Sequence, residues 1–293
     1  MELSGYLKML AGEADAAMDG FLPPEGERPG TMHTAMRYCV FAGGKRLRPV
    51  LCIAAAEACG GAREDALPAA CALELMHTYS LVHDDLPCMD DDDLRRGRPT
   101  CHKVYGEGMA VLCGDALLTE AFIVLAKAKG TERYPVGAMV AELAETGGSR
   151  KLIGGQVSDL EGEGKNLSLE ELVRIHEAKT AALLTCSVRL GAMSANASPE
   201  QLAALSKFGY ALGLAFQVID DILDVTQTTE ALGKTAGKDQ SVDKATYPSV
   251  IGLEASRQEA HRLTAEALGA LEPLGAKGER LREIAEWMLV RGY

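Results

Sequence analysis

Apolar residues recur at intervals of three and four along most of the chain, which is the period of an amphipathic helix. The longest segments of this kind are 67–82, 110–128, 169–195 and 201–225. Runs in which β-branched and polar residues alternate are missing, and aromatic residues make up only 5% of the sequence. Since a half-buried strand needs such alternation, the pattern predicts an all-α protein.

Glycine, proline and charged residues interrupt the helical pattern at short intervals. The breaks fall at 21–30, 97–108, 130–135, 162–168, 194–199, 226–248 and 269–278. None reads as a linker between domains. The helices are too many and too uniformly apolar for a four-helix bundle, because a helix that is apolar on all sides is buried on all sides. We therefore expect residues 1–293 to form a single-domain large helical bundle.

Composition and charge narrow the class of protein. Apolar residues make up 47% of the 293 residues, which is ample for a core. The net charge of -12 argues against binding to nucleic acid or to an anionic membrane. The eight cysteines include no CxxC pair, so they read as free thiols in a reducing compartment. No signal peptide and no uncharged run of eighteen residues is found, so we expect a cytoplasmic protein.

The stretch FQVIDDILD places polar residues on one stripe of a helix. Gln217, Asp220, Asp221 and Asp224 stand at i, i+3, i+4 and i+7, and apolar residues surround them. Two unit charges about 4 Å apart repel by about 4 kcal/mol at an effective dielectric near 20, more than a surface ion pair of at most ~1 kcal/mol returns. A doubly positive ion must offset this repulsion. Oxygen ligands without nearby Cys or His favour Mg²⁺.

A second acidic stretch, DDLPCMDDDD, contains Asp84, Asp85 and Asp90. On an ideal helix Asp84 and Asp90 would point about 120° apart. Pro87 cannot continue helical hydrogen bonding, so we expect the helix to end after Asp85 and Asp90 to turn back toward the same ion. The stretch could also be a solvated acidic loop, and DDILD could be structural. The two motifs together favour a metal site.

Basic residues accompany the acidic motifs. In AGGKRLRP, Lys45 and Arg48 stand three apart after two glycines, and Arg95 and Arg96 follow the first acidic motif. His77 lies seven residues before Asp84 on the same helical face. A surface loop and a buried structural histidine remain alternatives. The positions of three further lysines cannot be derived from spacing: Lys179, Lys234 and Lys244. No P-loop is matched, and the combination of aspartates and cations predicts a diphosphate site.

An ordered set of motifs strongly resembles the trans-isoprenyl diphosphate synthases, in particular the bacterial farnesyl and geranylgeranyl diphosphate synthases. The set is GGKRLRP, HTYSLVHDDLPCMDDDDLRRGRPTCH, GDALLTEAF, GGQVSDLEGEG, HEAKTAALL, FQVIDDILDVT and LGKTAGKDQSVDKATYPSVIGLE. Together these motifs cover nearly the whole chain. The resemblance implies an all-α bundle around a deep central cavity.

The resemblance also implies a role for each candidate residue. Asp84, Asp90 and Asp220 would bind Mg²⁺, in three ions that Mn²⁺ could replace; Asp85, Asp221 and Asp224 would support them, with Asp85 and Asp224 also counted as metal ligands. Arg95, Lys179 and Lys234 would hold the allylic diphosphate. Lys45, Arg48, His77 and Arg96 would hold isopentenyl diphosphate. Thr180 and Gln217 would face the allylic cation, and Lys244 would close over the diphosphate.

The implied reaction is ionisation of the allylic diphosphate, attack by the isopentenyl double bond and loss of a proton, for which the released pyrophosphate is the expected acceptor. Electrostatic stabilisation and exclusion of water would be the protein's task. Tyr79 and Ser80, five and four residues before Asp84, would set the product length. An aromatic residue at Tyr79, with Pro87 and Cys88 inside the motif, resembles the bacterial farnesyl type. We therefore expect a farnesyl diphosphate synthase acting on dimethylallyl and geranyl diphosphate.

Other interpretations stay open. Geranylgeranyl diphosphate synthase differs only in the length of the product. A non-catalytic prenyl-diphosphate-binding subunit is less favoured, because both acidic motifs and Arg95 and Arg96 are intact. A terpene cyclase is disfavoured, because it needs no second diphosphate grip. A homodimer is implied by the resemblance alone.

Overall fold

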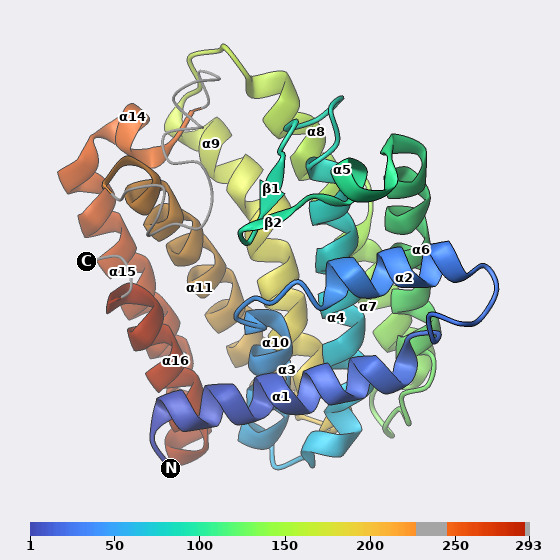
Figure 1. The fold of residues 1–293 in the computed structure, drawn as a ribbon. Helices are drawn as coiled ribbons and strands as arrows, with labels where there is room; N and C mark the ends of the chain where they lie inside the picture. The colour runs from blue at the N-terminus through green and yellow to red at the C-terminus, as the bar shows by residue number, and fades with distance from the viewer. Residues whose placement is uncertain (227–244, 291–293) are drawn as a thin grey trace.

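Helices form nearly all of the regular structure in the computed structural model, which describes residues 1–226 and 245–290 (Figure 1). In chain order the helices are α1 (Leu3–Phe21), α2 (Gly30–Val40), α3 (Leu47–Ala58), α4 (Arg63–Asp84), α5 (Cys101–Tyr105), α6 (Glu107–Leu125), α7 (Val136–Gly147), α8 (Leu152–Gly162), α9 (Leu169–His176), η1 (Glu177–Ala181), α10 (Ala182–Ser194), α11 (Pro199–Thr226), α14 (Tyr247–Ile251), α15 (Leu253–Ala270), η2 (Glu272–Gly278) and α16 (Glu279–Val290). The prediction of an all-α fold is confirmed.

One short hairpin departs from the helical prediction. Strands β1 (Leu94–Arg95) and β2 (Arg98–Pro99) pair antiparallel, with Arg95 opposite Arg98. The two residues of the turn, Arg96 and Gly97, have φ angles of 55° and 74°, as the type I′ turn of a two-residue hairpin requires. Two residues per strand are too few to show an alternating pattern. The hairpin matters because it presents two of the candidate arginines.

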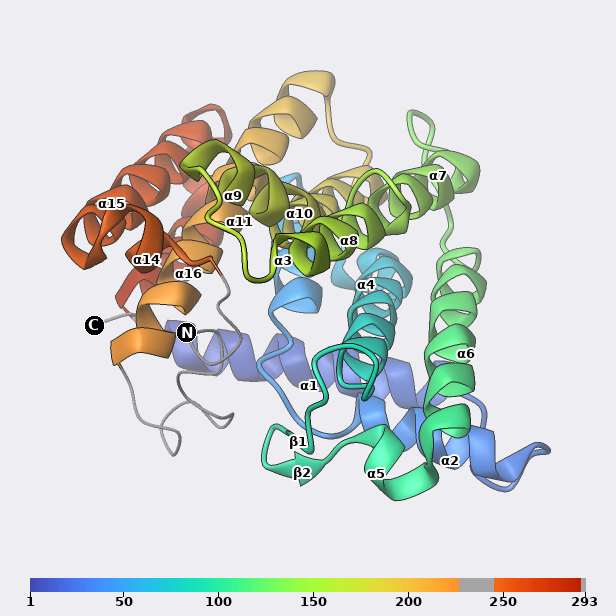
Figure 2. The same ribbon diagram turned by 90° about the horizontal axis from the view of Figure 1, so that it is seen from above.

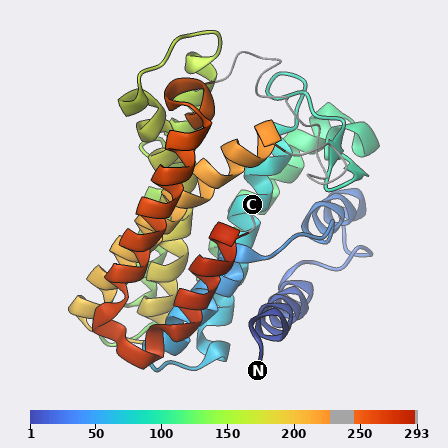
Figure 3. The same ribbon diagram turned by 90° about the vertical axis from the view of Figure 1, so that its left-hand side faces the viewer.

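The centre of the bundle is made by helices with small side chains. Nearly every residue of α3 is buried, including Ala54, Ala55 and Ala56. α3 packs against α4 and α10; α4 also packs against α6, and α11 packs against α10 and α15 (Figure 2). α15 and α16 cover one side of the bundle (Figure 3). Alanines add little bulk at these contacts, so the helices approach closely without loss of helical propensity.

A buried arginine within the candidate basic motif, Arg46, ties the start of α3 to α1 and α4. The Arg46 side chain is only 2% exposed, and it donates to Asp15 of α1 at 2.7 Å and to Glu74 of α4 at 2.9 Å. The guanidinium makes a third hydrogen bond, in which it donates to the Val40 carbonyl at 2.6 Å. Because removing one partner would leave a buried charge uncompensated, this pair holds the start of α3 in one place.

The predicted segment 169–195 is one helical run with an internal change of period. It begins at a capping box in which Ser168 and Glu171 bond reciprocally. Residues 177–181 then adopt a π-helix, η1, between α9 and α10. Such π segments occur often at functional sites, because the extra residue per turn redirects side chains. No feature of the apolar pattern predicts it.

Two helices, α6 and α11, are apolar and long enough to cross a membrane by length and composition. In α11 61% of the apolar window is buried inside the protein, but in α6 only 39% is. α6 carries Asp115 and Glu120 along its length, which would be costly at the centre of a bilayer. It also exposes Val111, Leu112 and Ile123. This apolar face of α6 is left without a partner in the single chain.

Candidate active site

The first acidic motif folds back on the end of α4. The helix ends at Asp84, and the chain then turns so that the amide of Asp90 donates to the Asp84 carbonyl at 2.8 Å. The amide of Asp92 donates to the Asp85 carbonyl at 3.2 Å. Pro87 lies in this turn and ends the helix for the reason expected from the sequence. The predicted return of Asp90 toward Asp84 is therefore confirmed.

The charge of Asp84 is only partly compensated by the protein. Burial raises the pKa of Asp84 to about 6, the charge of Lys179 opposes this rise, and Asp90 and Asp85 add to it. One unit of pKa corresponds to about 1.4 kcal/mol of difference between the charged and neutral forms. A divalent cation would bind here to a carboxylate whose charge the protein alone leaves unfavourable.

Asp85 has a different environment from Asp84. It is only 3% exposed, and Arg95 donates to both of its carboxylate oxygens, with Nε at 3.0 Å from Oδ1 and 3.4 Å from Oδ2. Arg95 also contacts Asp92 at 3.4 Å. The hairpin β1–β2 holds Arg95 in this position. Asp85 thus orients Arg95, which matches its expected supporting role better than its place among the metal ligands.

The second acidic motif is organised by a chain of hydrogen bonds. Thr180 donates to Gln217 at 2.9 Å, and Gln217 donates to Asp221 Oδ1 at 2.9 Å. The amide of Tyr247 donates to Asp221 Oδ2, also at 2.9 Å. Both oxygens of Asp221 are therefore engaged by the protein, and this residue anchors α14. Asp220 is half-buried and Asp224 is buried on the same stripe of α11.

The π-helix η1 lies between the two acidic motifs. Its Lys179 bonds to Asp159 of α8 at 2.6 Å, and the same ammonium lowers the pKa of Asp84. Its Thr180 donates a hydrogen bond to Gln217 of α11. The close packing of η1 on α11 requires Gly213, because a Cβ atom at that position would lie 2.5 Å from the Cα of Ala181. Adjacent residues of η1 therefore link the two motifs: Lys179 acts on Asp84 through its charge, and Thr180 donates to Gln217.

A group of cationic side chains stands beside the first motif. Arg96 donates to the carbonyl of Gly43, and a Cβ on Gly44 would lie 2.5 Å from its guanidinium carbon. Arg48 is half-buried, and its Nε has no hydrogen-bond partner among the described residues. The pKa of Arg48 is lowered to about 10, chiefly by burial; the charge of Glu74 opposes this shift and that of Arg96 adds to it. Arg48 and Arg96 lie close enough for their charges to interact, so this positively charged group would favour the binding of an anion.

His77 belongs to the same group but differs in charge. Burial lowers its pKa well below the usual value, and the charges of Arg48 and Arg96 lower it further. The imidazole is therefore neutral at pH 7, so it can donate one hydrogen bond without adding repulsion. Lys45 is exposed in the turn that follows Gly44. The remaining two predicted lysines, Lys234 and Lys244, lie outside the described residues.

The two candidate length-determining residues lie on different faces of α4. Ser80 precedes Asp84 by one turn and donates to the His77 carbonyl at 2.9 Å. The Tyr79 ring meets the His83 ring edge-on at 5.8 Å. His83 in turn lies against α6, where it occupies the space of a Cβ on Gly114. Tyr79 therefore shares the face of α4 directed at α6, whereas Ser80 shares the face of Asp84.

The structure adds polar residues that the sequence reasoning did not select. Asp159 pairs with Lys179, and both amide atoms of Gln156 are buried without a hydrogen-bond partner among the described residues. Both lie in α8, in the motif GGQVSDLEGEG. Their polar character within an apolar helix was the available signal, because a buried polar side chain needs a reason.

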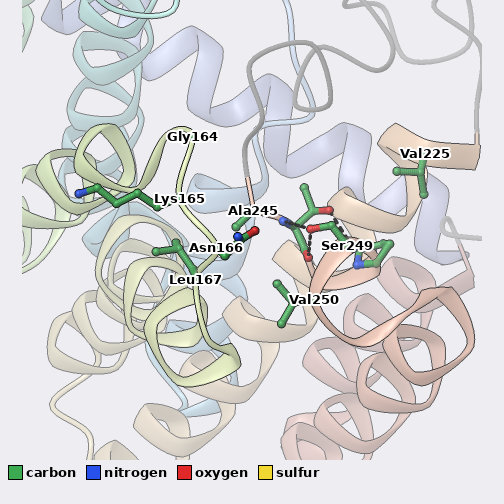
Figure 4. A pocket seen from close by; sticks show the side chains of 10 residues that line it. Gly164, Lys165, Asn166, Leu167, Val225, Ala245, Ser249 and Val250 are labelled. Carbon is green, nitrogen blue, oxygen red and sulfur yellow. Dashed lines mark hydrogen bonds between the residues drawn. The ribbon is translucent and has the colours of Figure 1, made fainter.

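A large pocket lies at the end of α11, next to the second acidic motif. It measures about 780 Å³ and is lined by the loop 164–167, by Val225 and by the start of α14, including Ala245 and Ser249 (Figure 4). None of its lining residues is an aspartate of the two motifs. A cavity of about 30 Å³ is lined instead by Asp85, Arg95 and Arg96. The electrostatics, rather than the larger volume, locate the candidate site.

The site and fold together are those of a helical protein in which carboxylates and arginines lie close enough to hold a metal ion and a diphosphate group. A family model described as polyprenyl synthetase matches residues 29–284. The chain belongs to the polyprenyl synthetase family. It is accordingly a prenyltransferase that elongates prenyl diphosphates.

Relatives and solved structures differ in the products their names indicate. The chain is 52% identical over 272 residues to the large subunit 1 of a heterodimeric geranylgeranyl pyrophosphate synthase of Arabidopsis thaliana, covering 91% of this chain and 73% of the relative. It is 45% identical to a dimethylallyltranstransferase of Fischerella ambigua, over 99% of this chain and 84% of the relative.

The solved structures share the isoprenoid synthase fold. A farnesyl-diphosphate synthase structure from Marinomonas, described as putative, matches with a TM-score of 0.84 at 37% identity, over 99% of both chains. A geranyltransferase structure from Helicobacter pylori, in complex with magnesium and an isoprenyl diphosphate, also has a TM-score of 0.84 at 36% identity; it covers 98% of this chain and 97% of that one. The fold prediction is confirmed. Bacterial enzymes with farnesyl names are among the similar structures, at 35–37% identity, whereas curated relatives at 52% identity carry geranylgeranyl names.

Adjacent aspartates in the second motif should separate structure from activity. We expect Asp221→Ala to lower the free energy of unfolding by about 1–3 kcal/mol. The buried amide of Tyr247 and the side-chain amide of Gln217 would each lose the carboxylate oxygen that accepts their hydrogen bond. Asp220→Ala should have a smaller effect on stability and still abolish Mg²⁺-dependent turnover. Urea denaturation and a prenyl transfer assay on both variants measure this. A larger loss of stability in Asp220→Ala would contradict the assignment.

Proposed function

We propose that the protein condenses isopentenyl diphosphate with allylic diphosphates, in head-to-tail fashion, and that its product is geranylgeranyl diphosphate. The observation that carries the reaction is the placement of Lys179 and Thr180 on one π-helical turn between the two aspartate motifs. The product length is supported by the geranylgeranyl names of relatives at 52% identity. It is supported also by Tyr79, which is directed at α6 rather than beneath Asp84.

Farnesyl diphosphate is the second candidate product. The buried aromatic ring of Tyr79, 5% exposed, stands five residues before Asp84 and favours a short pocket. Solved structures with farnesyl names at 35–37% identity support the same product. A non-catalytic subunit has no such support, because the described part of the site retains both acidic motifs and both arginines of the hairpin.

The donor set suits magnesium. The candidate ligands offer only carboxylate oxygen atoms, which Mg²⁺ prefers; they are Asp84, Asp90, Asp220 and Asp224. The raised pKa of Asp84 indicates that the protein alone stabilises its charged form poorly. We propose that these residues hold up to three ions, which Mn²⁺ could replace. When bound, the ions would neutralise the negative charge of the diphosphate as it departs.

We propose that different side chains of the protein bind the two substrates. Arg95, fixed by Asp85, and Lys179, fixed by Asp159, would hold the allylic diphosphate and stabilise it as a leaving group. Arg48, Arg96, Lys45 and neutral His77 would hold isopentenyl diphosphate beside it. Gln217 and Thr180 would direct oxygen atoms toward the allylic carbon, where positive charge develops. The proton lost at the end would pass to pyrophosphate, so no separate base is required.

We propose further that two copies pair through the apolar face of α6, at Val111, Leu112 and Ile123. These residues are 41%, 54% and 46% exposed, and clustered exposure of this kind usually marks an interface. We also propose a cytoplasmic location, since all eight cysteines are free thiols.

Product length can be measured directly. Purified protein incubated with isopentenyl diphosphate and C5, C10 or C15 allylic diphosphates should give a C20 endpoint that EDTA abolishes. Ser80→Phe should shorten the product to C15, because it adds a ring one turn before Asp84, whereas Tyr79→Met should leave it at C20. A C15 endpoint lengthened by Tyr79→Met would restore the farnesyl interpretation. No condensation with any starter would favour a binding subunit.

Two neighbouring glycines test the isopentenyl diphosphate grip. Gly44→Ala should raise KM for isopentenyl diphosphate ~10–100-fold with a smaller change in kcat, because the new Cβ displaces the guanidinium of Arg96. Gly43→Ala is the matched control. Gly43 also has a positive φ, of 91°, but nothing lies within 4 Å of its Cβ position. Equal increases in KM for the two variants would refute the role of Arg96.

Self-association through α6 predicts a change of mass on a single substitution. Sedimentation equilibrium should give twice the chain mass for the wild type and a single chain mass for Leu112→Glu, because a carboxylate would be buried in an apolar interface. Ile153→Glu, at an exposed apolar residue of α8 away from α6, is the control. A monomeric wild type would exclude the pairing.

A further inference from the structure

Three cysteines from three helices meet at one corner of the bundle. Cys39 lies on α2, Cys101 is the first residue of α5, and Cys113 lies on α6, and these helices pack against one another (Figure 2). Their sulfur atoms all lie within 4.8 Å of one another. Cys101 and Cys113 are buried and Cys39 is half-buried. Residues 74 positions apart in the sequence therefore offer a common set of sulfur ligands.

The separation of the sulfurs suits a shared ion. In tetrahedral zinc–thiolate sites each sulfur lies ~2.3 Å from the metal, so neighbouring sulfurs stand somewhat under twice that distance apart. The three thiols are also linked electrostatically. Hydrogen bonds from Cys113 and Cys39 lower the pKa of Cys101 to about 4, while those to Cys101 raise the pKa of Cys39 and Cys113. Among the three, the charged form is therefore most favoured at Cys101, and the close approach of the three sulfur atoms is what suits them to share a cation.

The surroundings can accommodate the charge of such a complex. Three thiolates and one divalent cation carry a net charge of -1. Arg98 lies 4.4 Å from the centre of the Tyr38 ring and shares with Cys39 and Cys101 the lining of the cavity of about 30 Å³. The same cavity reaches Arg95. Arg98 thus lines the same cavity as two of the sulfur ligands, and the cavity leaves room for a fourth ligand such as water.

The cluster is also joined to the acidic loop. Thr100, the residue before Cys101, donates from its hydroxyl to the Asp92 carbonyl at 2.8 Å and from its amide to the Asp93 carbonyl at 3.0 Å. An ion held by the three sulfurs would therefore fix one end of the segment that carries Asp90, Arg95 and Arg96. Hard oxygen ligands select Mg²⁺ and soft thiolates select zinc-like ions, so the two sites would not compete.

We propose that Cys39, Cys101 and Cys113 form a trithiolate site for one soft divalent cation of the zinc class, distinct from the magnesium site of the aspartates. Binding forms three metal–sulfur bonds and releases to solvent the protons of those cysteines that are still thiols. No oxidant or reductant is needed. The site is independent of the length of the prenyl product.

The test uses Cd²⁺ as a spectroscopic probe in the full-length chain. A parent carrying Cys59→Ser and Cys88→Ser removes the two other thiols that are not buried. Metal-free, reduced parent should bind one Cd²⁺ per chain with an ultraviolet sulfur-to-cadmium charge-transfer band, and Zn²⁺ should displace it. Changing Cys39, Cys101 and Cys113 to Ser together should remove the band. Cys113→Ser alone should weaken binding by more than the ~10–100-fold cost of losing an outer partner.

X-ray absorption of the zinc-loaded parent provides a measurement that does not depend on how the variants fold. Three sulfurs at ~2.3 Å are expected around the metal. A folded triple variant that keeps the band, a first shell of oxygen and nitrogen, or a parent without any band would each overturn the proposal.

Discussion

Repulsion between carboxylates brought together at low exposure is the constraint on which this structure depends. Asp84 and Asp90 are folded onto one another by backbone hydrogen bonds, and the burial that raises the pKa of Asp84 shows the cost. Such an arrangement is stable only where nearby cations offset the repulsion and the loss of hydration of the carboxylates. Lys179 and Arg95 provide part of that charge from the protein, and magnesium with its diphosphate ligand would provide the rest.

The supporting residues around these carboxylates are themselves held in pairs. Arg95 is oriented by Asp85, Lys179 by Asp159, and Gln217 by Thr180 and Asp221. Each pair limits the rotamers of a flexible side chain before substrate arrives, which lowers the entropic cost of binding. Neighbouring aspartates consequently differ in environment: Asp85 and Asp221 accept hydrogen bonds from the protein, whereas Asp84 and Asp220 are the ones for which we propose contacts to the metal ions.

The position of Tyr79 in the fold bears on the proposed product length. Tyr79 was expected to close the pocket because an aromatic residue at that spacing is typical of farnesyl enzymes. In the fold its ring packs on His83, on the face toward α6. A one-residue shift on a helix rotates a side chain by about 100°, so the residue that lies beneath Asp84 is Ser80.

The sequence by itself determined the helical class, the two aspartate motifs, the end of α4 near Pro87 and the cationic partners, since helical period, proline chemistry and charge repulsion are local properties. Tertiary structure alone decided that residues 177–181 form a π-helix between the motifs, that a two-residue hairpin aims Arg95 and Arg96 apart, and that Cys39, Cys101 and Cys113 converge. The π-helix and the cysteine cluster depend on contacts between segments far apart in the chain, and spacing along one segment carries no information about them. The hairpin is local, but two residues per strand are too few to leave an alternating pattern.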